Sequence, residues 1–192
     1  MADGSHLSGG RVFCADVNPS RPWELATASL DRTVAIWDLR KTATHPASSG
    51  SARKTAKPLE LLQHGLSVTS AVFSQTHNRL LTTCNDNLLR VFNFDGGKYA
   101  LHSSVGHSNK TGRFLTAFQA SWVQSSPDLF ICGSLEHPRG VDVYQHDGSV
   151  ACRLEDDNVA SVTSINVFHP TEPVMAAANS SGRVYLWRPH SE

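Results

Sequence analysis

Short apolar runs alternate with polar turns along most of the chain. Four segments share one order, in which an apolar run, a polar turn, a run of small residues and a second turn lead to a closing β-rich run. The small runs are "LATAS", "LLTTC", "LFICG" and "VMAAA", and the closing runs are "TVAIW", "LLRVF", "VDVY" and "RVYLW". Runs of this length between turn signals predict antiparallel strands. No segment has a helical period, so the chain is predicted to be all-β.

Each segment also carries an aromatic residue at the same place, namely Trp37, Phe92, Tyr144 or Trp187. The interval between Tyr144 and Trp187 fits the roughly 40–45 residues of a four-stranded propeller blade. The intervals between the earlier aromatic residues are longer, and insertions at two connections explain them. The "ATAS" and "MAAA" runs are expected to form inner strands near a central axis, where small side chains fit. The predicted organisation is a tail (1–11), a first repeat (12–40), a flexible basic insertion (41–58), a second repeat (59–95), a third repeat (96–147), a fourth repeat (148–188) and a tail (189–192).

Composition limits the partners without naming one. The 192 residues suffice for one domain, and 17 basic residues balance 17 acidic ones, so binding must come from local patches. No apolar run approaches the roughly 18 residues that span a bilayer, so no membrane partner is expected. The cysteines form no C-x-x-C pair, which predicts free thiols in a reducing compartment. They are Cys14, Cys84, Cys132 and Cys152.

Motifs of catalysis are missing from the sequence. It contains no HExxH, no Walker loop and no G-x-S-x-G, and its histidines do not pair with cysteines at zinc spacing. Catalytic triads assemble across distant positions, but every histidine with recognisable context lies in a turn or at the opening of a repeat. We therefore expect no enzyme, no metal, no cofactor and no small-molecule substrate.

Two windows carry basic residues and no acid. Residues 40–57 hold five cations among Ser, Thr, Ala, Pro and Gly, which is typical of a solvated linker or of a basic arm that contacts phosphates. Residues 96–127 hold Lys98, Lys110 and Arg113. In "SNKTGRFLTAF", Gly112 permits a tight hairpin and a strand is predicted to begin near Leu115.

Phe114 has two interpretations at the end of this loop. It either turns inward as the first residue of the strand "FLTAF", with its neighbouring cations solvated, or it is exposed beside them. Cations hold phosphates, and an exposed aromatic ring can stack on a base or enter a base step.

Part of this pattern resembles the WD-repeat family. "LATASLDRTVAIWDLR" is similar to the end of a WD repeat, and His64 and His107 are similar to the Gly-His position that opens such repeats. The resemblance implies a buried network of His, Ser/Thr, turn Asp and Trp, in which buried polar groups are paired. Asp31 and Asp86 match the turn aspartate, whereas Pro138 and Ser181 replace it in the third and fourth repeats, which are expected to lack the network.

The segments "LLTTCNDNLLRVFNF", "TGRFLTAFQASW", "EHPRGVDVYQHDG" and "NSSGRVYLW" resemble the WD repeat-containing protein 76 family, in its C-terminal part. More distantly they resemble damage-specific DNA-binding protein 2, in which a hairpin before the "LT" pair contacts DNA. This resemblance implies DNA or chromatin as partner, a nuclear location and a role in the DNA-damage response. The "CNDN" loop at residues 84–87 is a further candidate. The implied DNA-binding residues are Lys110, Thr111, Gly112, Arg113, Phe114, His137 and Arg139.

The "WDLR" string resembles the WDxR box of WD-repeat substrate receptors of cullin–RING ubiquitin ligases. The resemblance implies that Trp37, Asp38 and Arg40 bind the ligase adaptor, the large damage-binding subunit. The alternative is local, with Trp37 in the core and Asp38 paired with Arg40 at a strand end. A second alternative for the whole chain is a protein–protein scaffold that binds no DNA.

The resemblance implies a closed ring of about seven blades, which needs about 300 residues. A chain with about four blades would leave open sheets and an exposed apolar flank. We therefore expect the chain to be part of a longer protein or a shortened gene product. The alternative is a homodimer that closes the ring.

Overall fold

The structure is a computed structural model that describes residues 10–42, 57–111, 116–179 and 181–189. It contains four antiparallel sheets. The first sheet consists of β1 (Val12–Val17), β2 (Glu24–Ser29), β3 (Thr33–Asp38) and β4 (Glu60–Gln63). The second consists of β5 (Val68–Phe73), β6 (Arg79–Cys84), β7 (Leu88–Asp95) and β8 (Lys98–Gly106). The third consists of β9 (Ser121–Trp122), β10 (Leu129–Gly133), β11 (Gly140–Gln145) and β12 (Val150–Glu155). The fourth consists of β13 (Ile165–Phe168), β14 (Met175–Ala178) and β15 (Val184–Trp187).

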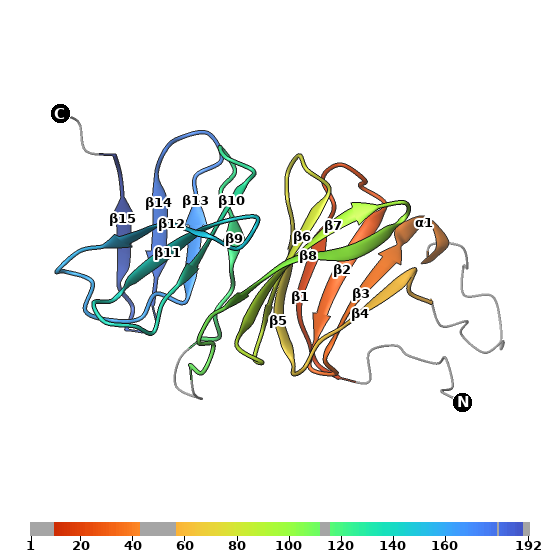
Figure 1. Cartoon of the computed structure of the whole chain (residues 1–192), viewed down its shortest axis with the longest axis horizontal. Coiled ribbons are helices and arrows are strands. Elements are labelled where there is room, and N and C mark those ends of the chain that lie inside the picture. The colour runs from red at the N-terminus through yellow and green to blue at the C-terminus, as the bar shows by residue number, and fades with distance from the viewer. Residues whose placement is uncertain (1–9, 43–56, 112–115, 180, 190–192) are drawn as a thin grey trace.

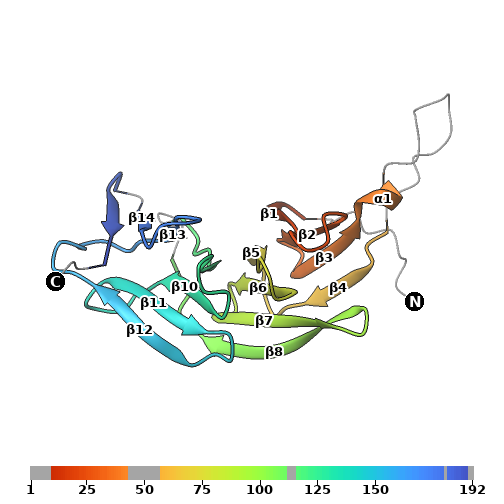
Figure 2. The same ribbon diagram turned by 90° about the horizontal axis from the view of Figure 1, so that it is seen from above.

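The four sheets stand side by side as blades of an open arc (Figures 1 and 2). Figure 2 shows β1 on the concave side of the arc, while β8 and β12 run along its convex side. This arrangement confirms the predicted all-β, partial β-propeller with four blades. The described part of the chain contains one short helix, α1 (Leu39–Thr42), and no helix long and apolar enough to cross a membrane.

The internal repeat is exact in the strand register. The aromatic residue of each third strand lies opposite a large apolar residue at the start of the preceding strand. The four pairs are Trp37 with Leu25, Phe92 with Leu80, Tyr144 with Phe130, and Trp187 with Met175. The equivalence of the four segments in the sequence is therefore an equivalence of position in the four sheets.

Repeats and sheets are offset by one strand. Strand β4 completes the first sheet, although it lies in the stretch predicted as the second repeat (59–95). In the same way β12 completes the third sheet from within the stretch predicted as the fourth repeat (148–188). Each of these repeats therefore contributes strands to two sheets, which ties neighbouring blades together through the backbone.

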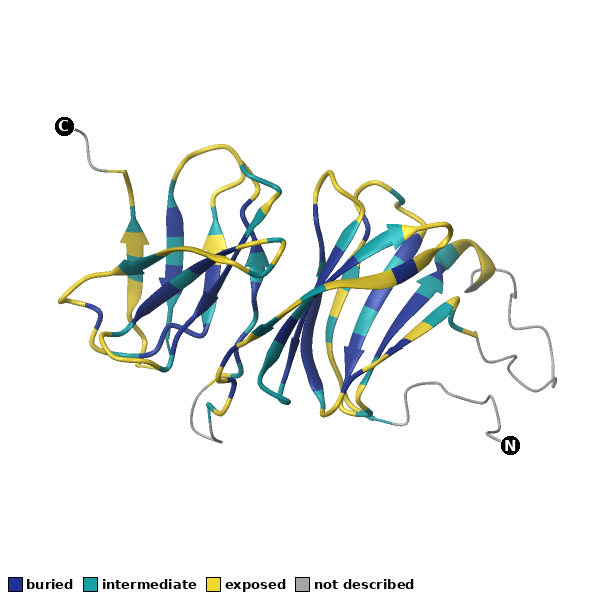
Figure 3. Ribbon diagram, in the orientation of Figure 1, coloured by how far each residue is buried: buried dark blue, intermediate teal, exposed yellow. Residues whose placement is uncertain are grey.

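Three apolar clusters fill the spaces between consecutive sheets, and Figure 3 shows buried residues concentrated there. The runs of small residues occupy the second strand of each sheet, with a paired strand on both sides. Ala26, Ala28 and Ala177 are fully buried there. The first strand, rather than this second strand, takes the concave edge of the first sheet, so the small residues serve packing between sheets.

The strand predicted to begin near Leu115 is not formed in its described part. Residues 116–120 contain only an isolated bridge from Gln119 to Ile165, and β9 begins at Ser121. Side chains of the second sheet hold this segment instead of a strand partner. The Thr69 hydroxyl donates to the Phe118 carbonyl at 2.8 Å, and the Ala120 amide donates to Thr83 Oγ1 at 3.0 Å. Phe118 itself is buried, whereas Phe114, to which the inward-facing interpretation applies, lies outside the described residues.

Candidate nucleic-acid interface and adaptor surface

Three loops gather on one face of the arc because the strands that lead into them end there. They are residues 85–87 between β6 and β7, the described residues 107–111 and 116–120 between β8 and β9, and residues 134–139 between β10 and β11. Cys84 pairs with Leu88, which also pairs with Gly106, so the first two loops start side by side. We call this side of the molecule the loop face; Figure 1 shows the end of β8 at the lower edge of the arc.

His107 and Asn109 fix the start of the central loop. The Nε2 atom of His107 lies 2.8 Å from the Gly133 carbonyl, which connects this loop to the end of β10. Its Nδ1 atom lies 2.7 Å from Asn109 Oδ1, and the Asn109 amide nitrogen donates to the Cys84 carbonyl at 2.7 Å. Asn109 also receives support from Asn87, whose Oδ1 accepts from the Asn109 backbone amide at 3.0 Å. Both side chains are buried, so the residues that follow them leave from a rigid base.

Lys110 and Thr111 follow this anchor at the mouth of a hollow. Lys110 is exposed, and within the part of the chain that the structure describes it forms no salt bridge. The hollow is lined by side chains that suit a polyanion with planar groups, because they combine a cation, amides, a hydroxyl and an aromatic ring. Its lining consists of Phe13, Thr69, Asn85, Asn109, Lys110, Thr111 and Ala117.

Three of the seven predicted DNA-binding residues lie outside the described residues. They are Gly112, Arg113 and Phe114. The described chain ends at Thr111 on one side and resumes at residue 116 on the other, so both ends of this stretch belong to the loop face.

His137 and Arg139 lie in the third loop, on the same face. His137 is exposed, and Arg139 is half-buried with a guanidinium that donates to the Leu135 carbonyl. Arg153 holds the loop from below, since its Nη2 donates to the Pro138 carbonyl at 2.6 Å. The structure therefore brings His137 and Lys110 to one face. Arg139 lies on this face too, but part of its guanidinium is hydrogen-bonded within its own loop.

The acids nearest these cations are paired within the protein. Arg90 Nη2 lies 2.6 Å from Asp86 Oδ2, and the Gly65 amide donates to the same oxygen at 3.1 Å. Burial raises the pKa of Asp86, but the hydrogen bonds and charge of Arg90 outweigh this effect, and the net pKa is lowered. Arg153 lies 3.0 Å from Asp142 and 3.6 Å from Glu136. This pairing reduces the repulsion that a phosphate would meet in the "CNDN" and "EHPRG" loops.

Each of the first two sheets contains part of the WD-type polar network. In the second sheet His64 Nε2 lies 3.0 Å from Thr82 Oγ1, and the His64 ring packs on Phe92. In the first sheet the Trp37 indole donates to Thr27 Oγ1 at 2.9 Å, and Asp31 accepts from the Thr33 hydroxyl. Trp37 is half-buried on an open sheet face, so the expectation of a core position for it is met only in part.

The predicted adaptor residues lie on the opposite face, at the end of β3 and in α1. Arg40 makes two parallel contacts of 2.9 Å with the buried carboxylate of Asp38, and its guanidinium also stacks 4.7 Å from the Trp23 ring. The Arg40 hydrogen bond lowers the pKa of Asp38 to about 2. The Arg40 side chain is still 63% exposed, so a fixed cation on an aromatic platform faces solvent. Figure 1 shows α1 at the upper edge of the arc, away from the end of β8.

Two aromatic residues of these surfaces were not predicted from the sequence. Phe13 lines the hollow beside Lys110, and Trp23 supports Arg40. Both are exposed, at 40% and 37%. Trp23 lies in the polar turn "SRPWEL", where an aromatic residue has no packing reason to occur. Its presence there could have indicated a functional surface. Phe13 lies in an ordinary strand run and gave none.

Among the described residues, no group of three or more His, Cys, Asp and Glu side chains could hold a metal ion. The four cysteines are free thiols, and burial raises the pKa of Cys14, Cys84 and Cys132. These thiols are therefore protonated and pack as small apolar groups.

Comparison with known proteins agrees with this fold. A family model described as "WD domain, G-beta repeat" matches residues 4–38, 56–93 and 152–188. The beta-propeller domain of Cps50 (Swd1) from Myceliophteria thermophila superposes with a TM-score of 0.69 at 13% identity, over 93% of this chain and 54% of that one. At this identity the likeness concerns the fold alone.

Sequence relatives carry more specific names. The chain is 38% identical over 180 residues to WD repeat-containing protein 76 of Mus musculus, covering 92% of this chain and 28% of the relative. It is 32% identical over 196 residues to Protein DAMAGED DNA-BINDING 2 of Arabidopsis thaliana, covering 96% of this chain and 33% of the relative. The chain thus spans about a third or less of these relatives. The resemblance stated from the sequence motifs is confirmed.

Proposed function

Because the chain belongs to the WD-repeat family, we propose that it is a non-catalytic binding module whose loop face binds DNA, within the nuclear response to DNA damage. The observation that carries this proposal is the position of the exposed Lys110. It directly follows the buried His107–Asn109 anchor and lies beside a hollow that Phe13 also lines. Relatives named for DNA damage binding support the choice of DNA or chromatin as the partner.

The expected contacts are mainly to phosphates. Lys110, Thr111 and His137 offer donors on one face, and Arg113 is expected to add a second cation. Phosphate contacts position a protein on the duplex without reading its sequence. The binding should therefore respond to the shape or modification of the DNA, with Phe114 or Phe13 available to stack on a base.

The test is fluorescence anisotropy with a labelled duplex at two salt concentrations. Lys110→Ala should weaken binding and reduce the slope of log K against log salt by about 0.9, the value for one lost phosphate contact. Arg113→Ala combined with Phe114→Ala should remove most of the affinity. Lys98→Ala is the matched control, since Lys98 is an exposed cation at the opposite end of the same strand, β8.

A properly folded wild type that binds no duplex at low salt would refute DNA binding. The protein–protein scaffold is then the function to pursue. An effect of Lys98→Ala as large as that of Lys110→Ala would show that only overall charge matters, and not the loop face.

A second function is favoured by the Arg40 surface. We infer that the Trp23–Asp38–Arg40 cluster is where a cullin–RING ligase adaptor would dock, because its cation is both held in place and exposed. Arg40→Ala should abolish co-purification with the large damage-binding subunit and leave DNA binding unchanged. Lys41→Ala is the control, because Lys41 is 72% exposed beside the same Asp38. Retained co-purification of the Arg40 variant would refute this surface.

A further inference from the structure

The first sheet adds two cations to the loop face, Arg11 and Arg32. Val12 at the start of β1 pairs with Ser29 at the end of β2, so Arg11 and the turn at residues 30–32 lie at the same end of this sheet. Figure 1 shows the start of β1 at the lower edge of the arc, as it shows the end of β8. Both arginines are exposed, and within the part of the chain that the structure describes neither forms a salt bridge. Their charges are therefore available to an external anion.

Arg11 is connected to the hollow of the proposed DNA interface. Its guanidinium carbon lies 5.7 Å from the centre of the Phe13 ring, and Phe13 lines the hollow together with Lys110. The Arg11 carbonyl accepts from the Leu30 amide at 2.9 Å, which joins Arg11 to the turn that carries Arg32. The hollow therefore has one cation on the side of the first sheet and another from the loop that follows β8.

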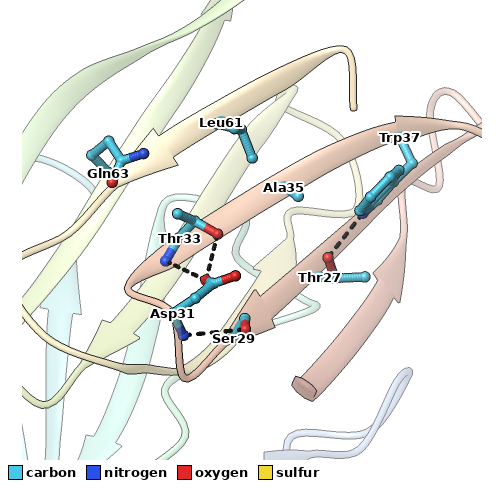
Figure 4. Close-up of a pocket in the computed structure, with 8 residues that line it drawn as sticks. All are labelled: Thr27, Ser29, Asp31, Thr33, Ala35, Trp37, Leu61 and Gln63. Carbon is cyan, nitrogen blue, oxygen red and sulfur yellow. Dashed lines mark hydrogen bonds between the residues drawn. The ribbon is translucent and has the colours of Figure 1, made fainter. Parts of the chain in front are cut away.

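The acid next to Arg32 is directed into its own turn. Asp31 Oδ1 accepts from the Thr33 amide at 3.0 Å and from the Thr33 hydroxyl at 2.6 Å (Figure 4). The Asp31 backbone amide donates to Ser29 Oγ at 3.3 Å, which closes the turn on its other side. The carboxylate thus holds the turn together, and it makes no ion pair with Arg32 among the described residues.

The backbone conformation of Arg32 is unusual for an arginine. Its φ is 71°, in the left-handed region that Gly and Asn adopt more readily than other residues. The corresponding turns of the second and fourth sheets place Asn87 and Gly182 in this region, with φ of 64° and 81°. The first sheet therefore has a long cation at a position where a smaller residue would be less strained. Such strain clusters at binding sites, and it indicates a role for the side chain beyond forming the turn.

The connections that follow the outer strands differ in charge along the loop face. Residues 64–67 after β4 contain no Lys, Arg, Asp or Glu, and the connection after β8 contributes Lys110. The connection after β12 begins with Asp156 and Asp157, which are exposed and lie on the loop face because β12 ends beside the start of β11. The Asn158 backbone amide donates to the Asp156 carboxylate and lowers its pKa, so this acid is ionised at neutral pH. The positive part of the loop face therefore lies on the first two sheets, and acids border it beyond the third.

We propose that bound DNA runs from Lys110 over the first sheet, where Arg11 and Arg32 contact further phosphates, and that it stays clear of the acids after β12. This course rests on the proposed function, because it describes how DNA lies on the loop face. The cations come from two neighbouring sheets, so the contacts span two blades. Phosphates recur along both strands of a duplex, and a row of cations of this kind holds the backbone without reading the bases.

The test is fluorescence anisotropy of the full chain with a labelled duplex over a series of salt concentrations. Arg32→Asn and Arg11→Gln should each reduce the slope of log K against log salt by about 0.9, the value for one lost phosphate contact. At about 0.1 M salt this corresponds to a loss of affinity of about 5- to 10-fold for each variant. The two substitutions together should reduce the slope by about 1.8, since they remove two separate contacts.

The stability of the Arg32 variants separates a role in binding from a role in folding. Arg32→Asn introduces the residue type that the second sheet has at this turn, so the melting temperature should stay constant or rise while the affinity for DNA falls. A residue that only supported the fold would lower both quantities when replaced. Arg32→Lys should retain most of the salt slope, because it keeps the charge.

Arg183→Ala is the matched control. Arg183 is also an exposed arginine without a salt bridge among the described residues, and it follows the corresponding turn of the fourth sheet. Its loss should change the affinity by less than about 2-fold, because it lies beyond the acids that follow β12. Asp156→Asn combined with Asp157→Asn should likewise leave the salt slope unchanged, since no phosphate is expected near these side chains.

The outcomes distinguish a wrong course from a wrong function. A folded wild type that binds no duplex at low salt would overturn both. If Lys110→Ala weakens binding while Arg11→Gln and Arg32→Asn leave the salt slope unchanged, DNA binding stands and the course over the first sheet is wrong. An effect of Arg183→Ala as large as that of Arg32→Asn would also overturn this course, because overall charge would then account for the binding.

Discussion

The junction between the first two sheets and the junction between the last two hold similar blades together by different means. At the first junction Tyr99 of the second sheet donates to Glu24 Oε2 at 2.9 Å and accepts from Arg21 Nη2 at 2.6 Å. Arg21 also pairs with Glu24 at 2.9 Å and lies 3.6 Å from the Phe94 ring. At the last junction an apolar cluster around Met175 and Ile131 packs the two sheets together. There the Tyr185 hydroxyl and the Trp187 indole are buried without a hydrogen-bond partner among the described residues.

This difference teaches what the repeat motif contributes. The sheets that retain the His, Thr, Asp and Trp positions also retain paired polar groups, and those groups accept only one packing arrangement. The last two sheets lack the turn aspartate, and the junction between them is mainly apolar, with Ser121 Oγ donating to the Asn166 carbonyl at 2.7 Å. The same fold is thus held mainly by specific polar contacts at one end and mainly by apolar burial at the other, and five substitutions test this contrast.

The largest effect is expected for Arg21→Ala. The substitution leaves Glu24 buried, at 7% side-chain exposure, without its cation, and it removes the contact with Phe94. Breaking a buried pair in this way costs about 3–5 kcal/mol. Guanidinium unfolding at fixed protein concentration measures the change, and Arg188→Ala on the exposed end of the fourth sheet is the control. A loss of less than about 1 kcal/mol in the free energy of unfolding would show that the Arg21–Glu24–Tyr99 contacts do not stabilise the first junction.

The same substitution in both junctions compares them directly. Tyr99→Phe removes a hydroxyl that bonds to charged groups, so it should lower the free energy of unfolding by about 1.5–3 kcal/mol. Tyr185→Phe removes a hydroxyl that has no partner among the described residues, so its effect should stay within about 0.5 kcal/mol of zero or be stabilising. Equal losses in the two variants, measured by denaturant unfolding, would contradict the contrast.

Much of the fold followed from the sequence because strand alternation and turns are local signals. The runs ending at Trp37, Phe92, Tyr144 and Trp187 could be aligned before their register was known, and the register agrees. The Tyr99–Glu24 bond could not be predicted, since its partners are 75 residues apart and neither stands in a motif. The start of β9 was misplaced for a similar reason, because side chains of another sheet hold residues 116–120.

The candidate site was predictable to a lesser degree. An acid-free loop with Lys110 indicated an exposed cation, and the structure agrees that this side chain is exposed. The sequence could not indicate that Phe13, far away in the chain, lines the same hollow. It also could not show that the Arg139 guanidinium donates a hydrogen bond to the Leu135 carbonyl. Proximity of this kind arises only when the blades are stacked.

A smaller effect is expected for the buried His–Thr bond of the second sheet. Thr82 is fully buried, and Thr82→Val keeps its shape while leaving His64 Nε2 without its partner. The expected loss is about 1–2 kcal/mol in the free energy of unfolding. Thr76→Val is the matched control, because Thr76 makes the same kind of contact with His77 at 2.8 Å in an exposed turn. A cost for Thr76→Val as large as that for Thr82→Val would mean that burial of the bond is irrelevant.

The smallest effect concerns pH and again belongs to the first junction. Burial lowers the pKa of His64 from its ordinary value of 6.5, an effect increased by the charge of Arg90 and opposed by the Leu62 carbonyl and the charge of Asp86. Below about pH 6.5 the unfolded chain therefore binds a proton that folded His64 resists, and stability falls as the pH is lowered. Above that pH both states are neutral and this contribution is constant.

Replacing His64 by Leu should flatten this dependence, although the variant is less stable at every pH because it lacks the Thr82 bond. Desolvation lowers the pKa of His146 as well, so a slope of the same sign should remain in the variant. The measurement is the free energy of unfolding from about pH 8 to about pH 5.5 for wild type, His64→Leu and the exposed-turn control His77→Gln. An unchanged slope in His64→Leu, with the control also unchanged, would place the pH sensitivity outside the first junction. The polar network would then confer packing specificity there without any dependence on protonation.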